Sequence, residues 1–92
     1  MHEDSVITYR QNPRTAGRVV DGLAFVVTPD DNKLHTLNGT GALIWQLAEN
    51  GCTLDEIVSA ITSRYSVEPE RARQDAETFA TDLLRRRILE TP

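Results

Sequence analysis

The spacing of hydrophobic and polar positions along this chain changes near Asn38, from short β-like runs to helical periodicity. Before Asn38, two runs rich in β-branched and aromatic residues, 18–20 and 23–27, flank the dipeptide Asp21-Gly22. This dipeptide supplies the positive φ angles that a two-residue hairpin turn requires. The two runs therefore predict a β-hairpin.

A polar turn over residues 29–32 separates this hairpin from a shorter run at 33–37, which predicts a third antiparallel strand. Such a small sheet must pack against helices to be stable. Ahead of the hairpin only residues 6–9 alternate, so we expect residues 1–14 to form an N-terminal arm that is loosely attached. Residues 15–92 are then expected to form a single domain.

The second half of the chain predicts three helices. Asn38 is a suitable N-cap for a first helix that runs to about Glu49 and ends at Gly51. Thr53 begins the second helix, because Glu56 three positions later completes a capping box. The apolar positions of this second helix share one narrow stripe, namely Leu54, Ile57, Val58, Ile61 and Tyr65.

Pro69 suits the first turn of a third helix, which we expect to reach about Arg87. The core stripe of this helix is predicted to be Ala72, Ala76, Phe79 and Leu83. Ala80 and Leu84 extend the apolar surface toward one flank. Two interpretations of the flank stay open: it belongs to the core, or it is a surface that another backbone approaches closely. On the second interpretation, Ala80→Glu or Leu84→Asp abolishes ligand binding without unfolding the domain.

Composition narrows the class of protein. The chain has 92 residues, 39% of them apolar, which suffices for one small soluble domain. Its longest apolar run is far shorter than the ~20 residues that span a bilayer, and its acidic start lacks the basic segment of a signal peptide, so we expect a cytoplasmic protein without a membrane partner. The 14 carboxylates against 10 Lys and Arg favour a peptide or protein partner over nucleic acid.

The sequence lacks the residue combinations that catalysis needs. One cysteine and two histidines provide neither a disulfide nor a zinc site, and no nucleophile with a base has credible spacing, so we predict a non-enzyme without cofactor or metal. Cys52 precedes a helix start, where it packs on Ile57 as a hydrophobic staple or carries a stabilised thiolate; the staple is favoured. His35 contacts a ligand or is a surface histidine of the third strand; the second interpretation is favoured.

Three short strands followed by three helices predict an α+β, winged helix-turn-helix-like fold. Many such domains are DNA-binding regulators, and this remains one alternative. The charges argue against it, because the first turns of the third helix carry Glu68, Glu70, Asp75 and Glu77 against Arg71 and Arg73. A helix start of this composition repels DNA phosphates as strongly as it attracts them.

Several short motifs follow one another in an order and spacing that are specific in combination. They are Arg18 to Gly22, Leu37-Asn38, Gly41 to Trp45, Thr53 to Ile57, Tyr65 to Val67, and Asp75, Phe79 and Leu83. Over about residues 15–90 the chain thereby resembles the PqqD-like family of peptide-modification chaperones, whose domain is called the RiPP recognition element.

The resemblance implies that the domain binds the leader segment of a ribosomally made precursor peptide and performs no chemistry itself. In such proteins the leader is added as a strand beside the third strand and packs against the last helix. Carried over by position, the pairing edge is Lys33, Leu34, His35, Thr36 and Leu37, and the groove wall is Ala76, Ala80, Leu83 and Leu84. Arg73 and Arg87 at the edge of this flank are expected to orient an acidic leader. Asp75 is expected to tie the helix to the hairpin through Arg18.

The resemblance also implies a separate partner enzyme, which receives the bound leader. In the family this is a radical-SAM enzyme, as in pyrroloquinoline quinone assembly, or the leader-cleaving cysteine protease of lasso-peptide maturation. The helix start at 39–42 and the size of the chain suit the lasso group. A scaffold that binds such an enzyme without any affinity for peptide is the remaining alternative.

Overall fold

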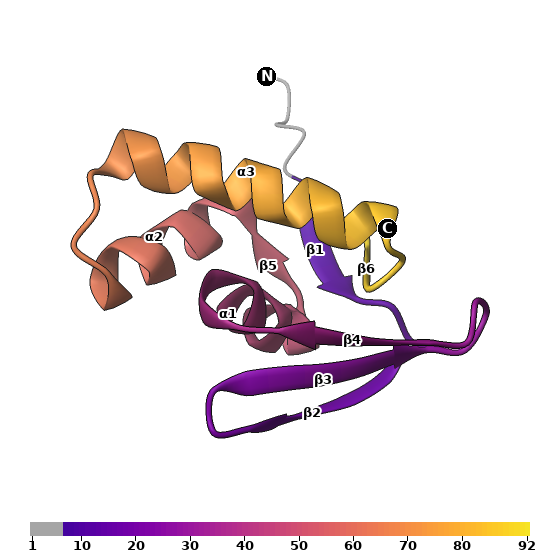
Figure 1. The fold of residues 1–92 in the computed structure, drawn as a ribbon. Helices are drawn as coiled ribbons and strands as arrows, with labels where there is room; N and C mark the ends of the chain where they lie inside the picture. The colour runs from indigo at the N-terminus through magenta and orange to yellow at the C-terminus, as the bar shows by residue number, and fades with distance from the viewer. Residues whose placement is uncertain (1–6) are drawn as a thin grey trace.

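The computed structural model describes residues 7–92, so residues 1–6 of the predicted arm lie outside the described part of the chain. The strands are β1 (Thr8–Gln11), β2 (Ala16–Val20), β3 (Leu23–Thr28), β4 (Lys33–Leu37), β5 (Cys52–Thr53) and β6 (Leu89–Glu90). The helices are α1 (Gly39–Leu47), continued by a 3-10 turn over Ala48–Asn50, α2 (Leu54–Arg64) and α3 (Pro69–Arg85). The predicted α+β fold of three strands and three helices is confirmed, and a second small sheet is added to it (Figure 1).

Strands β2, β3 and β4 form an antiparallel sheet in that order, which we call the wing. The predicted hairpin turn is confirmed, since Asp21 and Gly22 have φ angles of 53° and 81°. The wing lies below α1, and α3 lies on the far side of α1 (Figure 1). One face of the wing is buried against the helices, because Ala24 and Val26 of β3 have no exposed surface.

Gly17 of β2 allows the wing to pack closely on α1. It pairs with Val26 on the buried face. A Cβ atom at Gly17 would lie 2.6 Å from the carbonyl oxygen of Phe25 and 2.9 Å from Cζ2 of Trp45. Both distances are shorter than real carbon contacts, so a side chain at this position displaces the strand or the indole.

We therefore expect Gly17→Ala to destabilise the domain by roughly 1–3 kcal/mol through overpacking. Urea unfolding followed by circular dichroism measures this change. Ala16→Ser, one residue earlier at an exposed position, is the control and should leave the midpoint almost unchanged. Equal midpoints for both variants would show that the wing does not need the close approach at Gly17.

The start of α2 follows the sequence prediction in atomic detail. The Thr53 hydroxyl accepts a hydrogen bond from the Glu56 backbone N–H at 3.2 Å, and the Glu56 carboxylate accepts one from the Thr53 N–H at 2.8 Å. The capping box is thus complete. Asn38 is the N-cap of α1 as expected, although its side chain makes no capping hydrogen bond.

The prediction of a loosely attached arm is wrong for residues 8–14. β1 is the central strand of a second antiparallel sheet, between β5 and β6. Tyr9 is buried in the core, and the Gln11 side-chain amide donates a 2.8 Å hydrogen bond to the Trp45 carbonyl. The sequence concealed this sheet because β5 and β6 have two residues each, too few to show an alternating pattern.

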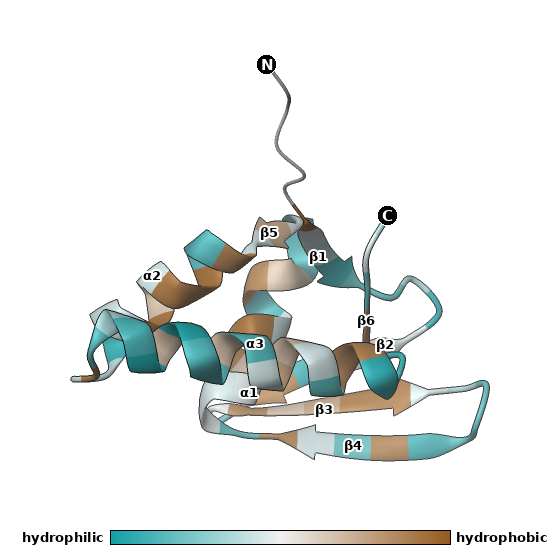
Figure 2. Cartoon of the chain, turned by 90° about the horizontal axis from the view of Figure 1, so that it is seen from above, coloured by the Kyte–Doolittle hydropathy of each residue, from teal (hydrophilic) through white to brown (hydrophobic). Residues whose placement is uncertain are grey.

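The buried face of α3 differs from the predicted stripe at one position. Ala72, Ala76 and Ala80 have no exposed surface and Leu83 has 2%, whereas Phe79 is 40% exposed. Phe79 is therefore not a core residue, and Ala80 is. Small side chains let α3 pack closely against its neighbours, so the row of alanines occupies the contact and the larger ring is left at its margin. In Figure 2 α3 is largely hydrophilic, in contrast to β3.

The predicted link between α3 and the hairpin is also wrong. Asp75 accepts its hydrogen bond from Arg71, one turn earlier on α3, at 3.3 Å. Arg18 is opposite Phe25 in the wing and forms no ion pair with any described residue. Within residues 7–92, no helix has the length and apolar content needed to cross a bilayer.

Candidate functional site

β4 is one of the two edge strands of the wing, and it is the one beside α3; β2 is the other. β4 pairs with β3 on one side, and no described strand pairs with it on the other. Every second residue of Lys33–Leu37 therefore directs its backbone N–H and C=O groups away from β3, where they are available to an additional strand. α3 runs roughly along β4 in the views of both Figure 1 and Figure 2.

The register of the wing decides which β4 side chains point toward the helices. Lys33, His35 and Leu37 are opposite Thr28, Val26 and Ala24, so they share the buried face of the sheet. Leu34 and Thr36 point to the outer face, and Leu34 is 63% exposed there. Of the five predicted edge residues, Leu37 belongs to the core, and the other four offer side chains to one face or the other.

His35 belongs to a hydrogen-bonded chain that joins β4 to the β3–β4 turn. The buried Thr28 hydroxyl lies 2.5 Å from Oδ1 of Asp31 and 2.9 Å from Nε2 of His35. The hydrogen bond with Thr28 lowers the pKa of Asp31, so Asp31 is ionised at neutral pH and only accepts. Thr28 must then donate to Asp31 and accept from the Nε2–H of His35. His35 thus has a structural role within the wing.

The predicted groove wall on α3 needs correction. Ala76, Ala80 and Leu83 lie in the core and have almost no surface with which to contact a ligand. Leu84 is half-buried and packs against the core cluster. Ala76, Ala80 and Leu83 therefore do not form an open wall, and of the four predicted residues Leu84 alone keeps side-chain surface that a ligand can contact.

The two predicted arginines lie in different surroundings. Arg73 donates a 2.6 Å hydrogen bond to Asp55 at the start of α2, and this bond raises the pKa of Arg73. Arg73 is therefore engaged within the domain. Arg87 follows the C-cap of α3 in the left-handed region, with φ of 64°, and lines a cavity beside the β3–β4 turn.

Phe79 is a further candidate for peptide contact. From the sequence, it was expected in the core and not at the surface. It lies seven positions before Arg86, which places both on the same side of α3. Arg86 lines the cavity beside the β3–β4 turn together with Thr28 and Asp31 of the wing. Phe79 also lines a surface pocket of α3 with Asp82 and Arg85, and Arg85 borders the cavity beside the β3–β4 turn as well. An apolar residue at helical spacing normally predicts core, and this is why the sequence placed it there.

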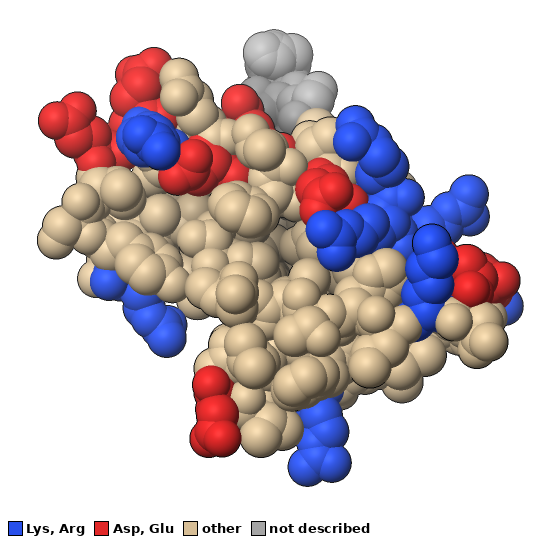
Figure 3. Space-filling model, in the orientation of Figure 1, with Lys and Arg blue, Asp and Glu red and all other residues tan. Residues whose placement is uncertain are grey.

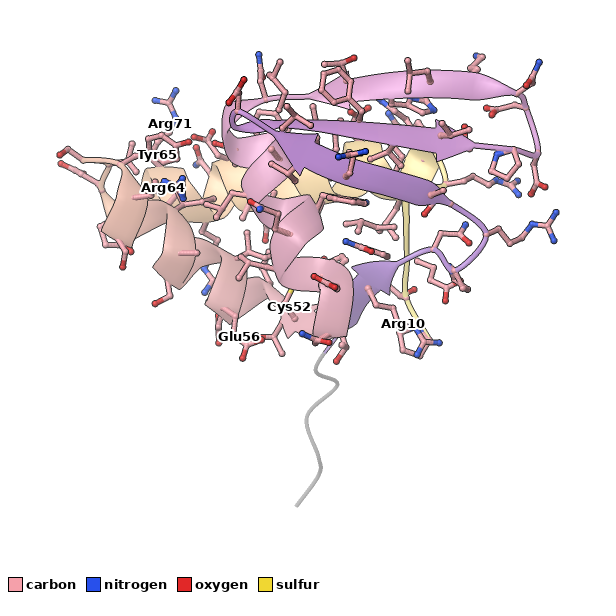
Figure 4. The ribbon with its side chains drawn as sticks, turned by 90° about the horizontal axis from the view of Figure 1, so that it is seen from below. Arg10, Cys52, Glu56, Arg64, Tyr65 and Arg71 are labelled. Carbon is pink, nitrogen blue, oxygen red and sulfur yellow. The ribbon has the colours of Figure 1, made fainter. Side chains whose placement is uncertain are left out.

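Cys52 is not a reactive thiol. It is buried in β5, beside Glu56 at the start of α2 and away from the wing (Figure 4). Burial, assisted by the negative charge of Glu56, raises the pKa of Cys52 to about 11. The thiol is therefore neutral at physiological pH. This result contradicts the thiolate alternative and agrees with a packing role beside the buried Ile57.

Comparison with known families decides the identity of this fold. The family described as coenzyme PQQ synthesis protein D (PqqD) matches residues 24–89. The chain belongs to the PqqD family. The matched segment contains β4 and the whole of α3, so both elements of the candidate site are within the PqqD-like part of the chain.

Two solved structures resemble the whole PqqD-like domain. One is described as TbiB1 in complex with the TbiA(beta) leader peptide; it is 26% identical, with a TM-score of 0.81, over 88% of this chain and 94% of that one. The other, described as lasso peptide synthetase B1 complexed with the leader peptide, is 24% identical, with a TM-score of 0.77, over 89% and 96% of the two chains. No curated protein sequence matches the chain significantly.

Proposed function

We propose that this protein binds the leader segment of a ribosomally made precursor peptide by adding it as a strand to the free edge of β4. The observation that carries the proposal is this edge, which lies beside α3 in a fold similar to that of a protein solved with its leader peptide. The bound leader is then presented to a separate enzyme, either a leader-cleaving protease of lasso-peptide maturation or a radical-SAM enzyme. This chain supplies binding and no catalytic group.

The geometry of the wing gives a physical basis for such binding. A strand added to β4 completes the backbone hydrogen bonds of Lys33–Leu37, and its alternate side chains point toward α3. Each main-chain hydrogen bond contributes about 1 kcal/mol net. Each buried apolar anchor contributes about 1.5–3 kcal/mol. A few of each offset the cost of association and give a dissociation constant around micromolar or lower.

Titration of a fluorescently labelled leader peptide with the purified protein tests this function. The peptide is taken from the short precursor-like reading frame that lies nearest to the gene, and binding is followed by fluorescence polarisation. We expect saturable binding of the peptide and none of a labelled DNA duplex. Binding of DNA without binding of peptide would contradict the proposal. If peptide binds only after the neighbouring enzyme is added, the scaffold alternative is supported instead.

The mode of binding has its own test, because a strand on a sheet edge alternates in the direction of its N–H groups. We expect N-methylation of the peptide backbone to weaken binding at every second position within the paired segment. The positions between them serve as matched controls, since their N–H groups point to solvent. If N-methylation weakened binding equally at successive positions of the paired segment, strand addition would be excluded.

A further inference from the structure

A cavity of about 280 Å³ lies where the wing, the β1–β2 loop and the end of α3 meet. We call it the wing-tip cavity. Its charged lining residues are Arg14, Asp30, Asp31, Arg85, Arg86 and Arg87. The cavity adjoins the beginning of β4, because its wall residue Thr28 pairs with Lys33 and also contacts His35.

The lining has an excess of positive charge. Four arginines oppose two aspartates, and both aspartates are already engaged. Arg14 pairs with Asp30, and Thr28 donates to Asp31. Arg86 pairs with Asp82, one turn earlier on α3, at 2.8 Å. Arg85 and Arg87 form no ion pair with any residue in 7–92, so two guanidinium groups are free to bind an anion.

The backbone around the wing-tip cavity is held in place. The Asn12 side-chain amide donates to the Arg87 carbonyl at 3.0 Å, and the Asn12 N–H donates to the Ile88 carbonyl at 3.0 Å. Arg14 and Thr15 in turn donate to Asn12 from their backbone N–H groups. These bonds fix the loop against the end of α3, so the cavity is organised before any ligand arrives.

The opposite end of α3 has no comparable excess of positive charge. Its first turns carry Glu68, Glu70, Asp75 and Glu77 against Arg71 and Arg73. In Figure 3, Lys and Arg side chains gather toward the end of α3 and the β3–β4 turn, while several acidic groups lie over the beginning of α3. The surface beside β4 is therefore electrostatically asymmetric along its length.

We propose that the wing-tip cavity binds an Asp or Glu side chain of the strand-added peptide through Arg85 and Arg87. This inference rests on the proposed function and adds a charge requirement at one end of the bound segment. Lys33 points to the same face of the wing as His35 and Leu37. Side chains of a strand alternate between the two faces of the sheet. The carboxylate is therefore expected an even number of positions from the apolar anchors, on the face of the sheet that they share, and close to the Lys33 end of β4.

The test combines variants of the protein with variants of the peptide. We expect Arg85→Ala/Arg87→Ala to weaken leader binding by about 10-fold at low salt, and added salt to reduce the difference. Arg10→Ala/Arg18→Ala is the matched control, because it removes the same charge; Arg10 lies away from the wing (Figure 4) and Arg18 lies on β2. Circular dichroism verifies that each variant is folded.

In parallel, each Asp and Glu of the peptide is replaced in turn by its amide. One replacement should weaken binding to the wild-type protein and have no further effect on the Arg85→Ala/Arg87→Ala variant, which identifies the bound carboxylate. If every replacement weakens binding equally to both proteins, or if the two arginine pairs give the same loss, the wing-tip site is excluded while leader binding stands. Absence of binding to the wild-type protein would instead reject the proposed function.

Discussion

Replacing Ala80 with glutamate is expected to unfold the domain, although the residue lies on the helix that faces the candidate site. Ala80 has no exposed surface and belongs to the core cluster, to which the helices and both sheets contribute. A carboxylate there has no partner and no water, and the buried face of α3 has no space for its stem. We expect a loss of roughly 4 kcal/mol or more, which approaches the whole stability of a domain of this size.

Circular dichroism and urea unfolding measure this loss directly. Thr81→Glu is the matched control, since it places the same charge one residue later at an exposed position. The control should retain the native midpoint within about 0.5 kcal/mol. A folded Ala80→Glu variant that had lost only peptide binding would restore the interpretation of this flank as an open surface.

Replacing Phe79 with alanine is expected to weaken leader binding by about 10- to 100-fold while the domain stays folded. The ring is 40% exposed and lines a surface pocket on a flank of α3 with Asp82 and Arg85. A strand added to β4 directs alternate side chains toward this flank, so the ring is available as an apolar contact. The expected loss corresponds to the ~1.5–3 kcal/mol that one buried aromatic anchor contributes.

Fluorescence polarisation with the labelled leader peptide measures the change in affinity. Ile7→Ala is the control, because Ile7 is a large apolar residue that is 55% exposed beside β1, outside the wing. Its removal should leave the dissociation constant unchanged. Equal affinities for the Phe79→Ala variant and the wild-type protein would place the peptide elsewhere than between β4 and α3.

The sequence predicted those features that depend on neighbouring residues. The turn at Asp21-Gly22 needs two residues that tolerate positive φ, and the capping box needs Thr53 and Glu56 three positions apart. Each of these signals is complete within a few positions of the chain. The wing and the start of α2 could therefore be assigned before any contact between distant segments was known.

The sequence did not predict features that depend on contacts between distant segments. β1 is held by Cys52–Thr53 and Leu89–Glu90, and no local pattern of residues 8–11 indicates those partners. The wing-tip cavity likewise joins Arg14, Asp30 and Arg85, which are far apart in the chain. In the sequence, each of these arginines indicates only a solvated surface position. Only the fold brings them together around one cavity.

The sequence by itself determined the wing and the three helices, because periodicity and turn residues encode local structure; the choice of Lys33–Leu37 as the pairing edge came from the family resemblance. Only the tertiary structure decided which face of α3 is buried. Positions 79 and 80 differ by about 100° around a helix, and both lie near the border of the apolar stripe. Ala72, Ala76 and Ala80 pack in the core, which fixes this border and leaves Phe79 at the surface.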